Sequence, residues 1–237
     1  MATTTPEFIL ALDLPEREHA LRICDLLQPE IQWVKVGYQM FCHYGVPWLE
    51  ELHQRGLNVF LDLKLHDIPN TVAEAIAQIA SLPVQMTTLH CLGGVDMLSA
   101  ARESANKHNP QLKLIGVTLL TSHRPGDFEA LGGISTHEEL IQHLAKRAVE
   151  SQLDGFVSAP TEATHLRPLL PHGLFVTPGI RPAGADVDDQ ARAATPGIAA
   201  QSGATHLVVG RPILKSATPL QAYRDMMAQA RVGSTSS

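Results

Sequence analysis

The feature that most constrains the fold is a regular alternation of short apolar runs with segments of helical character. The apolar runs are Phe8–Leu12, Trp33–Val36, Asn58–Leu63, Val84–Leu89, Leu112–Leu119, Gly155–Val157, Leu174–Val176 and His206–Val209. Helical period or composition marks intervening segments that include Glu16–Leu27, Val72–Ile79, Met97–Lys107, Glu138–Glu150, Thr161–Leu170, Gln190–Ser202 and Pro219–Ala230. This order predicts parallel strands that are joined by helical crossovers.

The length of the chain selects among the parallel architectures. Divided over eight units, the 237 residues give roughly 30 residues per unit, the size of a βα unit, and a (β/α)8 barrel holds about 250 residues. The alternative is an open doubly wound sheet, whose dinucleotide-binding members carry G-x-G-x-x-G after the first strand. Here the first run is followed by Asp13-Leu14-Pro15. We therefore expect an α/β fold, a single-domain (β/α)8 TIM barrel over residues 1–232, with a mobile polar tail at 233–237.

Composition and charge exclude several classes of partner. Hydrophobic residues make up 44% of the chain and charged residues 18%, which is enough apolar material for a sizeable core. The net charge of −6 argues against a nucleic-acid partner and against a polybasic membrane anchor. The cysteines are widely spaced at Cys24, Cys42 and Cys91, and the chain has no signal-like segment or long apolar run. We expect a cytoplasmic protein.

Charged residues are concentrated in the segment Phe60–Thr71, which reads F-L-D-L-K-L-H-D-I-P-N-T. The period of a strand places Asp62 and Lys64 on one face and the intervening leucines on the other. With Lys35 after the second strand, and with Asp67, these residues form an alternating set of two acids and two bases. Such a set is balanced in charge and able to act on an anion, although a structural salt bridge is the alternative interpretation.

The same segment also predicts the start of a helix. Pro69 suits the first helical turn, and Asn70 or Thr71 is able to cap it. Simple capping is therefore a second interpretation of Asp67, Asn70 and Thr71.

The last two strands are followed by loops that are typical of phosphate binding. Gly179 and Arg181 follow the seventh strand, and Gly210 and Arg211 follow the eighth. Barrels commonly bind phosphate in these two loops, where glycines allow the backbone to approach and arginines offer planar donors.

The small-residue segment Ala183–Asp189 is typical of a lid, with Gln190 placed to reach inward; an ordinary surface loop is the alternative. No H-E-x-x-H or clustered Cys/His pattern is present, so we expect no metal site. Ser158 lacks the G-x-S-x-G context of a serine nucleophile.

Together these motifs resemble one family. The segment 60–71 combines with A-L-D at 11–13, V-K-V-G at 34–37, L-L-T-S at 119–122, T-P-G-I-R-P at 177–182 and V-G-R-P-I at 209–213. In this order, over nearly the whole chain, they resemble the orotidine 5′-phosphate decarboxylases of the bacterial type.

The resemblance implies a homodimeric barrel that converts orotidine 5′-monophosphate (OMP) to UMP and CO₂, the last step of de novo pyrimidine synthesis, without a cofactor. It implies that Lys64 donates a proton to C6 and that Asp62 faces the substrate carboxylate. Lys35 would organise Asp62 and a ribose hydroxyl. Asp67 and Thr71 would reach the ligand bound in the neighbouring subunit.

The resemblance also implies the remaining substrate contacts. Asp13 would bind ribose, Thr121 would contact the ligand, and the phosphate would be held by Arg181, Gln190, Gly210 and Arg211. Relatives often carry a serine near C-S-A after the sixth strand that contacts the pyrimidine. Here the residues are V-S-A-P at 157–160, so Ser158 is left outside the expected site.

Two other functions remain open. One is a metal-dependent sugar-phosphate decarboxylase or aldolase of the same superfamily, which shares D-x-K-x-x-D and would lose activity in a chelator. The other is a non-catalytic nucleotide-binding barrel, which would bind UMP without turning over OMP.

Overall fold

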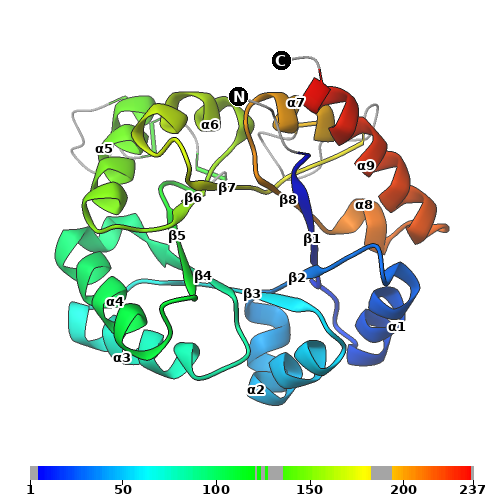
Figure 1. The fold of residues 1–237 in the computed structure, drawn as a ribbon, viewed down its shortest axis with the longest axis horizontal. Coiled ribbons are helices and arrows are strands. Elements are labelled where there is room, and N and C mark those ends of the chain that lie inside the picture. Colours follow the sequence, from blue (N-terminus) through cyan, green and yellow to red (C-terminus); the bar gives the residue numbers. More distant parts are fainter. Residues whose placement is uncertain (1–4, 121, 124–125, 128–135, 183–193, 236–237) are drawn as a thin grey trace.

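The strands of the chain close into a barrel. The structure, a computed structural model, describes residues 5–120, 122–123, 126–127, 136–182 and 194–235. Eight parallel strands pair in chain order, and β8 pairs with β1 to complete the ring (Figure 1). They are β1 (Glu7–Ala11), β2 (Trp33–Val36), β3 (Asn58–Leu65), β4 (Met86–His90), β5 (Lys113–Val117), β6 (Gly155–Val157), β7 (Leu174–Thr177) and β8 (His206–Val209). The predicted (β/α)8 barrel is confirmed.

Helices surround the barrel on its outer side (Figure 1). They are α1 (Arg17–Leu27), α2 (Tyr38–Gln54), α3 (Pro69–Ala80), α4 (Gly94–His108), α5 (His137–Glu150), α6 (Pro160–Leu166), α7 (Pro196–Gln201), α8 (Arg211–Leu214) and α9 (Pro219–Thr235), with 3₁₀ turns at η1 (Cys91–Gly93) and η3 (Arg167–Leu169). Within the described part of the chain, none of them is both long and apolar enough to cross a membrane.

The barrel has two hydrophobic cores because successive strand residues point to opposite faces. The inner core fills the barrel and consists of Ile9, Ala11, Phe60, Met86, Ile115, Val176 and Val208. The outer core lies between strands and helices, and it takes the alternate strand residues, such as Leu10, Val34 and Leu61. The alternation in β3 explains the site, because Asp62 follows Phe60 on the inward face.

Two helices differ from the pattern expected from the sequence. Helix α2 was not among the helical segments named from the sequence, and Gly45, at φ 61°, and Pro47 interrupt its helical geometry. Helix α7 begins at Pro196 rather than at residue 190, since Ala194 forms a bridge to Ile180 and the Thr195 hydroxyl accepts the N–H of Ile198 as a cap.

The prediction that a polar tail starts at residue 233 is wrong. Helix α9 continues to Thr235, and Gly233 and Ser234 are buried. The physical reason is packing of α9 against α7: a Cβ added at Gly233 would lie 2.4 Å from the carbonyl oxygen of Gly197. The first residue of the predicted tail is thus a glycine that this close approach requires. Residues 236–237 lie outside the described residues.

We expect Gly233→Ala to lower the free energy of unfolding by about 1–3 kcal/mol, because the new methyl group has no space against α7. In an exposed helix the same change stabilises the protein by about 1 kcal/mol. The sign of the change in the free energy of unfolding therefore shows whether Gly233 packs against α7. Chemical denaturation measures it, and Ala228→Gly at an exposed position of α9 calibrates the helix propensity. A Gly233→Ala protein that is more stable than the wild type would instead support a polar tail that starts at residue 233.

Candidate active site

A cavity of about 470 Å³ opens at the carboxyl ends of the strands. Eight of the residues expected at the site from the sequence line it: Asp13, Lys35, Asp62, Lys64, Gly179, Arg181, Gly210 and Arg211. The strand ends therefore bring together residues that are up to about two hundred positions apart in the chain, as expected of a βα barrel.

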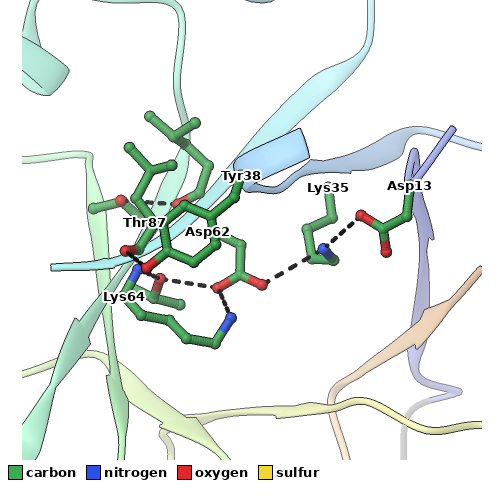
Figure 2. Close-up of polar contacts among 9 residues, drawn as sticks. Asp13, Lys35, Tyr38, Asp62, Lys64 and Thr87 are labelled. Carbon is green, nitrogen blue, oxygen red and sulfur yellow. Dashed lines mark hydrogen bonds and ion pairs between the residues drawn. The ribbon is translucent and has the colours of Figure 1, made fainter. Parts of the chain in front are cut away.

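Four charged side chains form a continuous chain of ion pairs at one side of this cavity. Lys35 Nζ lies 3.4 Å from Asp13 Oδ1 and 3.5 Å from Asp62 Oδ2. Lys64 Nζ donates to the other oxygen of the same carboxylate, Asp62 Oδ1, at 2.8 Å. Figure 2 shows Lys35 between the two aspartates. The two positive charges thus flank the carboxylate of Asp62.

The charges around Asp62 decide its protonation state. Burial by itself raises the pKa of this carboxyl group, but Lys35 and Lys64, with hydrogen bonds from Lys64 and Thr88, outweigh burial and hold the pKa below its ordinary value. Asp62 is therefore an anion at neutral pH. A fixed negative charge and an ammonium donor stand side by side within the cavity.

The backbone of Lys64 adopts an unusual conformation. Its φ is 45°, in the left-handed region, which costs about 1–2 kcal/mol for a residue with a Cβ. The pairing of β3 with β4 shifts register between Leu61 and Leu65. This irregularity lets Lys64 direct its ammonium group at the neighbouring Asp62, and strain of this kind is concentrated at functional sites.

Asp67 and Thr71 lie apart from the ion-pair chain. Both are exposed, and Asp67 Oδ1 accepts the backbone N–H of Ile68 at 2.6 Å. Within one chain the fourth charge of the cluster is therefore Asp13, not Asp67. Capping by Asn70 or Thr71 is also wrong: the N-cap of α3 is Ile68, without a side-chain hydrogen bond, because Pro69 already starts the helix one residue earlier.

The loops after β7 and β8 bring glycines and arginines to the cavity. Gly179 has a φ of 75°, which favours glycine, and Arg181 is buried, with its Nη1 donating to the carbonyl of Ile180 at 2.9 Å. Gly210 and Arg211 line the same cavity. The predicted contacts Thr121 and Gln190, and the predicted lid Ala183–Asp189, lie outside the described residues.

Several residues around the site were not predicted from the sequence. Apolar side chains form much of the cavity wall, namely Phe60, Val117, Leu119, Leu120, Val157, Val176, Pro178, Val208 and Leu214. Their alternation with outward-facing residues was the available signal for the strand members. Tyr38, whose hydroxyl donates to the carbonyl of Leu63 at 2.6 Å (Figure 2), follows Gly37 directly. Ser158 is buried, and it is not among the residues that line the cavity.

Two histidines stack beside the cluster. The rings of His66 and His90 are 5.4 Å apart and nearly parallel. Burial, reinforced by His66, His123 and Lys64, lowers the pKa of His90 to about 4, so this ring is neutral at pH 7. Among the described residues, no group of three or more histidine, cysteine or acidic side chains is arranged to hold a metal ion.

An eight-stranded βα barrel whose cavity holds a lysine–aspartate cluster around a buried carboxylate, together with glycines and arginines, belongs to the class of barrel enzymes that act on small phosphorylated substrates. Comparison with known proteins narrows the class. A model of the orotidine 5′-phosphate decarboxylase / HUMPS family matches residues 6–226. The chain belongs to this family, and the family inferred from its motifs is confirmed.

Relatives named orotidine 5′-phosphate decarboxylase align over nearly the full chain. The orotidine 5′-phosphate decarboxylase of Opitutus terrae is 42% identical over 226 residues, which cover 95% of this chain and 98% of the relative. That of Pseudomonas putida strain GB-1 is 44% identical, covering 97% and 99%. A crystal structure of orotidine 5′-phosphate decarboxylase from Lactobacillus acidophilus superposes with a TM-score of 0.84 at 35% identity, covering 96% and 99%.

The neutral state of His90 predicts a pH-dependent stability. Below pH 6.5 the unfolded chain protonates this histidine, whereas the folded protein does so only near pH 4. The unfolded state then binds more protons, so stability falls as the pH falls through this window. We expect His90 to account for at most about 3 kcal/mol of the loss, at about 1.4 kcal/mol per pKa unit.

The free energy of unfolding, measured by denaturant titration between pH 7 and pH 4, checks this prediction. His90→Gln removes the titrating group and should flatten the profile. His172→Gln, at an exposed position, is the control and should leave the slope as it is. Equal slopes for wild type and His90→Gln would contradict a neutral buried His90.

Proposed function

We propose that this chain decarboxylates OMP to UMP and CO₂ and that Lys64 is the proton donor of the reaction. The activity follows from the family and from relatives that carry the name orotidine 5′-phosphate decarboxylase over nearly their whole length. The observation that supports the role of Lys64 is its ammonium group at 2.8 Å from a buried, ionised Asp62 within the cavity.

The chemistry explains why these charges are suitable. Breaking the bond between C6 and the carboxylate carbon releases neutral CO₂ and leaves the electron pair on C6, in an orbital that the pyrimidine ring does not delocalise. The Lys64 ammonium stabilises this developing charge and then transfers a proton to C6, which yields UMP. Interactions that strengthen only in the transition state accelerate the reaction.

Asp62 acts on the substrate carboxylate that leaves as CO₂ in the same step. Bound OMP brings its carboxylate towards the fixed charge of Asp62, and two unit charges about 4 Å apart repel by about 4 kcal/mol at an effective dielectric constant of 20. The repulsion disappears when CO₂ leaves as a neutral molecule. We assign the larger share of catalysis to Lys64, whose attraction grows as charge develops on C6.

The remaining cavity residues bind the parts of the substrate that are distant from the reacting bond. In the proposal, Arg181 and Arg211 bind the phosphate with the backbone of Gly179 and Gly210, and Asp13 and Lys35 bind the ribose. We also assign a phosphate contact to Gln190 and a ligand contact to Thr121. Binding energy at the phosphate is available to orient the base against Lys64.

We expect Lys64→Ala to lower kcat for OMP at least about a thousandfold, because the variant lacks both the cation and the proton donor. The decrease in absorbance that accompanies conversion of OMP to UMP measures the rate. Binding of UMP should persist, because the phosphate contacts are intact. Lys113→Ala, which removes a lysine paired with Asp154 at the start of β5, is the matched control, and near-normal kcat in Lys64→Ala would refute the mechanism.

A chelator separates the proposed reaction from the metal-dependent alternative. UMP formation that keeps its rate in excess EDTA supports a cofactor-free decarboxylase, whereas a rate that is lost in EDTA and restored by a divalent cation supports the metal-dependent one. UMP binding without turnover of OMP identifies a non-catalytic barrel.

We further propose that two copies of the chain associate and share their active sites. Beside the cavity, three apolar or aromatic side chains are exposed on adjacent strand ends: Tyr38 by 56%, Ile68 by 65% and Leu92 by 38%. Asp67 and Thr71 lie in the same region, exposed and outside the ion-pair chain. An exposed apolar surface that also carries polar side chains is suited to an isologous interface.

Mixing two inactive variants tests the sharing of sites. If Asp67 acts in the partner's site, a hybrid of Lys64→Ala and Asp67→Asn chains contains one site with both defects and one intact site. Random reassociation then restores about a quarter of wild-type activity, because half of the dimers are hybrids with one good site each. Mixtures that stay inactive although hybrids form would show that Asp67 acts within its own chain.

We also propose a cytoplasmic location. Cys24 and Cys91 are buried free thiols, and Cys42 is an exposed one, a pattern suited to a reducing compartment. Fractionation of the native cells with detection of the protein in the soluble cytoplasmic fraction tests this location.

A further inference from the structure

Two adjacent threonines on β4 face different parts of β3. Both are fully buried, at 0% exposure. Thr87 Oγ1 donates to the backbone carbonyl of Leu61 at 2.9 Å. Thr88 Oγ1 accepts the backbone N–H of Lys64 at 2.8 Å and donates to Asp62 Oδ1 at 3.0 Å. A single hydroxyl therefore contacts both the backbone of the lysine and the carboxylate at its side.

The register of the sheet explains why this hydroxyl is needed. Leu61 pairs with Thr87, and the next pair is Leu65 with Leu89. Three residues of β3, from Asp62 to Lys64, thus stand opposite Thr88 alone. Regular ladder hydrogen bonds are interrupted here, and the N–H of Lys64 is instead bonded to the Thr88 side chain.

The hydroxyl also completes the surroundings of Asp62. Oδ2 of this carboxylate faces Lys35, while Oδ1 receives both Lys64 Nζ and Thr88 Oγ1. The side-chain torsion of Asp62 is thereby restrained from two directions. Because Lys64 is bonded at its backbone and at its ammonium group, the lysine is restrained at both ends of its side chain.

We propose that Thr88 is a positioning residue for decarboxylation, whose hydroxyl holds the Lys64 backbone and the Asp62 carboxylate in one geometry. The inference rests on the proposed function of the cluster. Thr88 is not among the residues that line the cavity, so it acts through Lys64 and Asp62 rather than on the substrate. Its removal is expected to change the reacting end of the site and to leave the phosphate end unchanged.

Thr88→Val tests the proposal because valine has nearly the same shape and lacks the hydroxyl. We expect kcat for OMP to fall at least about tenfold, with KM changed less than about threefold, since positioning for the chemical step is lost while ground-state phosphate binding is retained. Thr88→Ser keeps the hydroxyl and should recover most of the rate. Active sites are counted by titration with UMP, so that a reduced folded fraction does not affect kcat.

Thr87→Val is the matched control. It makes the same change on the same strand at the same burial, but the lost bond goes to a backbone carbonyl outside the cluster. Thermal unfolding of both variants separates stability from catalysis. If Thr88→Val does not fold, Thr88→Ala replaces it in the same comparison.

A crystal structure of Thr88→Val provides a readout that does not depend on activity. We expect Lys64 to leave its left-handed conformation or its ammonium group to move away from Asp62, with neither change in Thr87→Val. Equal kcat in the two valine variants, no recovery in Thr88→Ser, or an unchanged Lys64 would overturn the proposal. If the wild-type protein does not convert OMP, the proposed function fails, and the crystal structures still decide whether Thr88 positions Lys64.

Discussion

The site depends on the burial of one carboxylate, that of Asp62, between two ammonium groups. An unpaired buried charge costs several kcal/mol, whereas a buried charge with close partners and satisfied hydrogen bonds is tolerated. Lys35 and Lys64 supply the opposite charges, and Thr88 supplies a neutral donor. Removing any partner would leave the others in an unfavourable environment, so the cluster is strongly coupled and a fixed negative charge is maintained in the cavity without a bound substrate.

The barrel makes such a cluster possible because the residues that stabilise the fold are separate from those at the site. The inner and outer cores stabilise the fold through apolar contacts, and only the residues at the carboxyl ends of the strands are left for chemistry. The strained backbone of Lys64 is held by the surrounding strands. The loops after β7 and β8 contribute glycines and arginines to the same cavity, so in the proposed reaction phosphate binding and bond breaking involve different side chains.

Several errors of interpretation have a common origin. Local patterns offered Asn70 or Thr71 as the cap of α3, began α7 at residue 190 and placed a polar tail from residue 233. Each of these boundaries is decided by a contact that is distant in the chain or by the first residue able to start a helix: Ala194 bridges to Ile180, and Gly233 packs against Gly197. Helix boundaries depend on such contacts more than on intrinsic propensity. The strands were predicted closely because their apolar alternation is itself the consequence of burial on both faces.

Strand period and the order of βα units are enough to predict the barrel, the placement of Asp62 and Lys64 on one face, and the loops that bear Gly179, Arg181, Gly210 and Arg211. The packed chain is needed to see that Asp13 rather than Asp67 joins the cluster of a single chain, that Lys64 is left-handed, and that Thr88 bonds to both Lys64 and Asp62. The physical reason is register: the pairing of β3 with β4 determines which side chains meet, and a threonine in an ordinary strand pattern does not reveal its partner across the sheet.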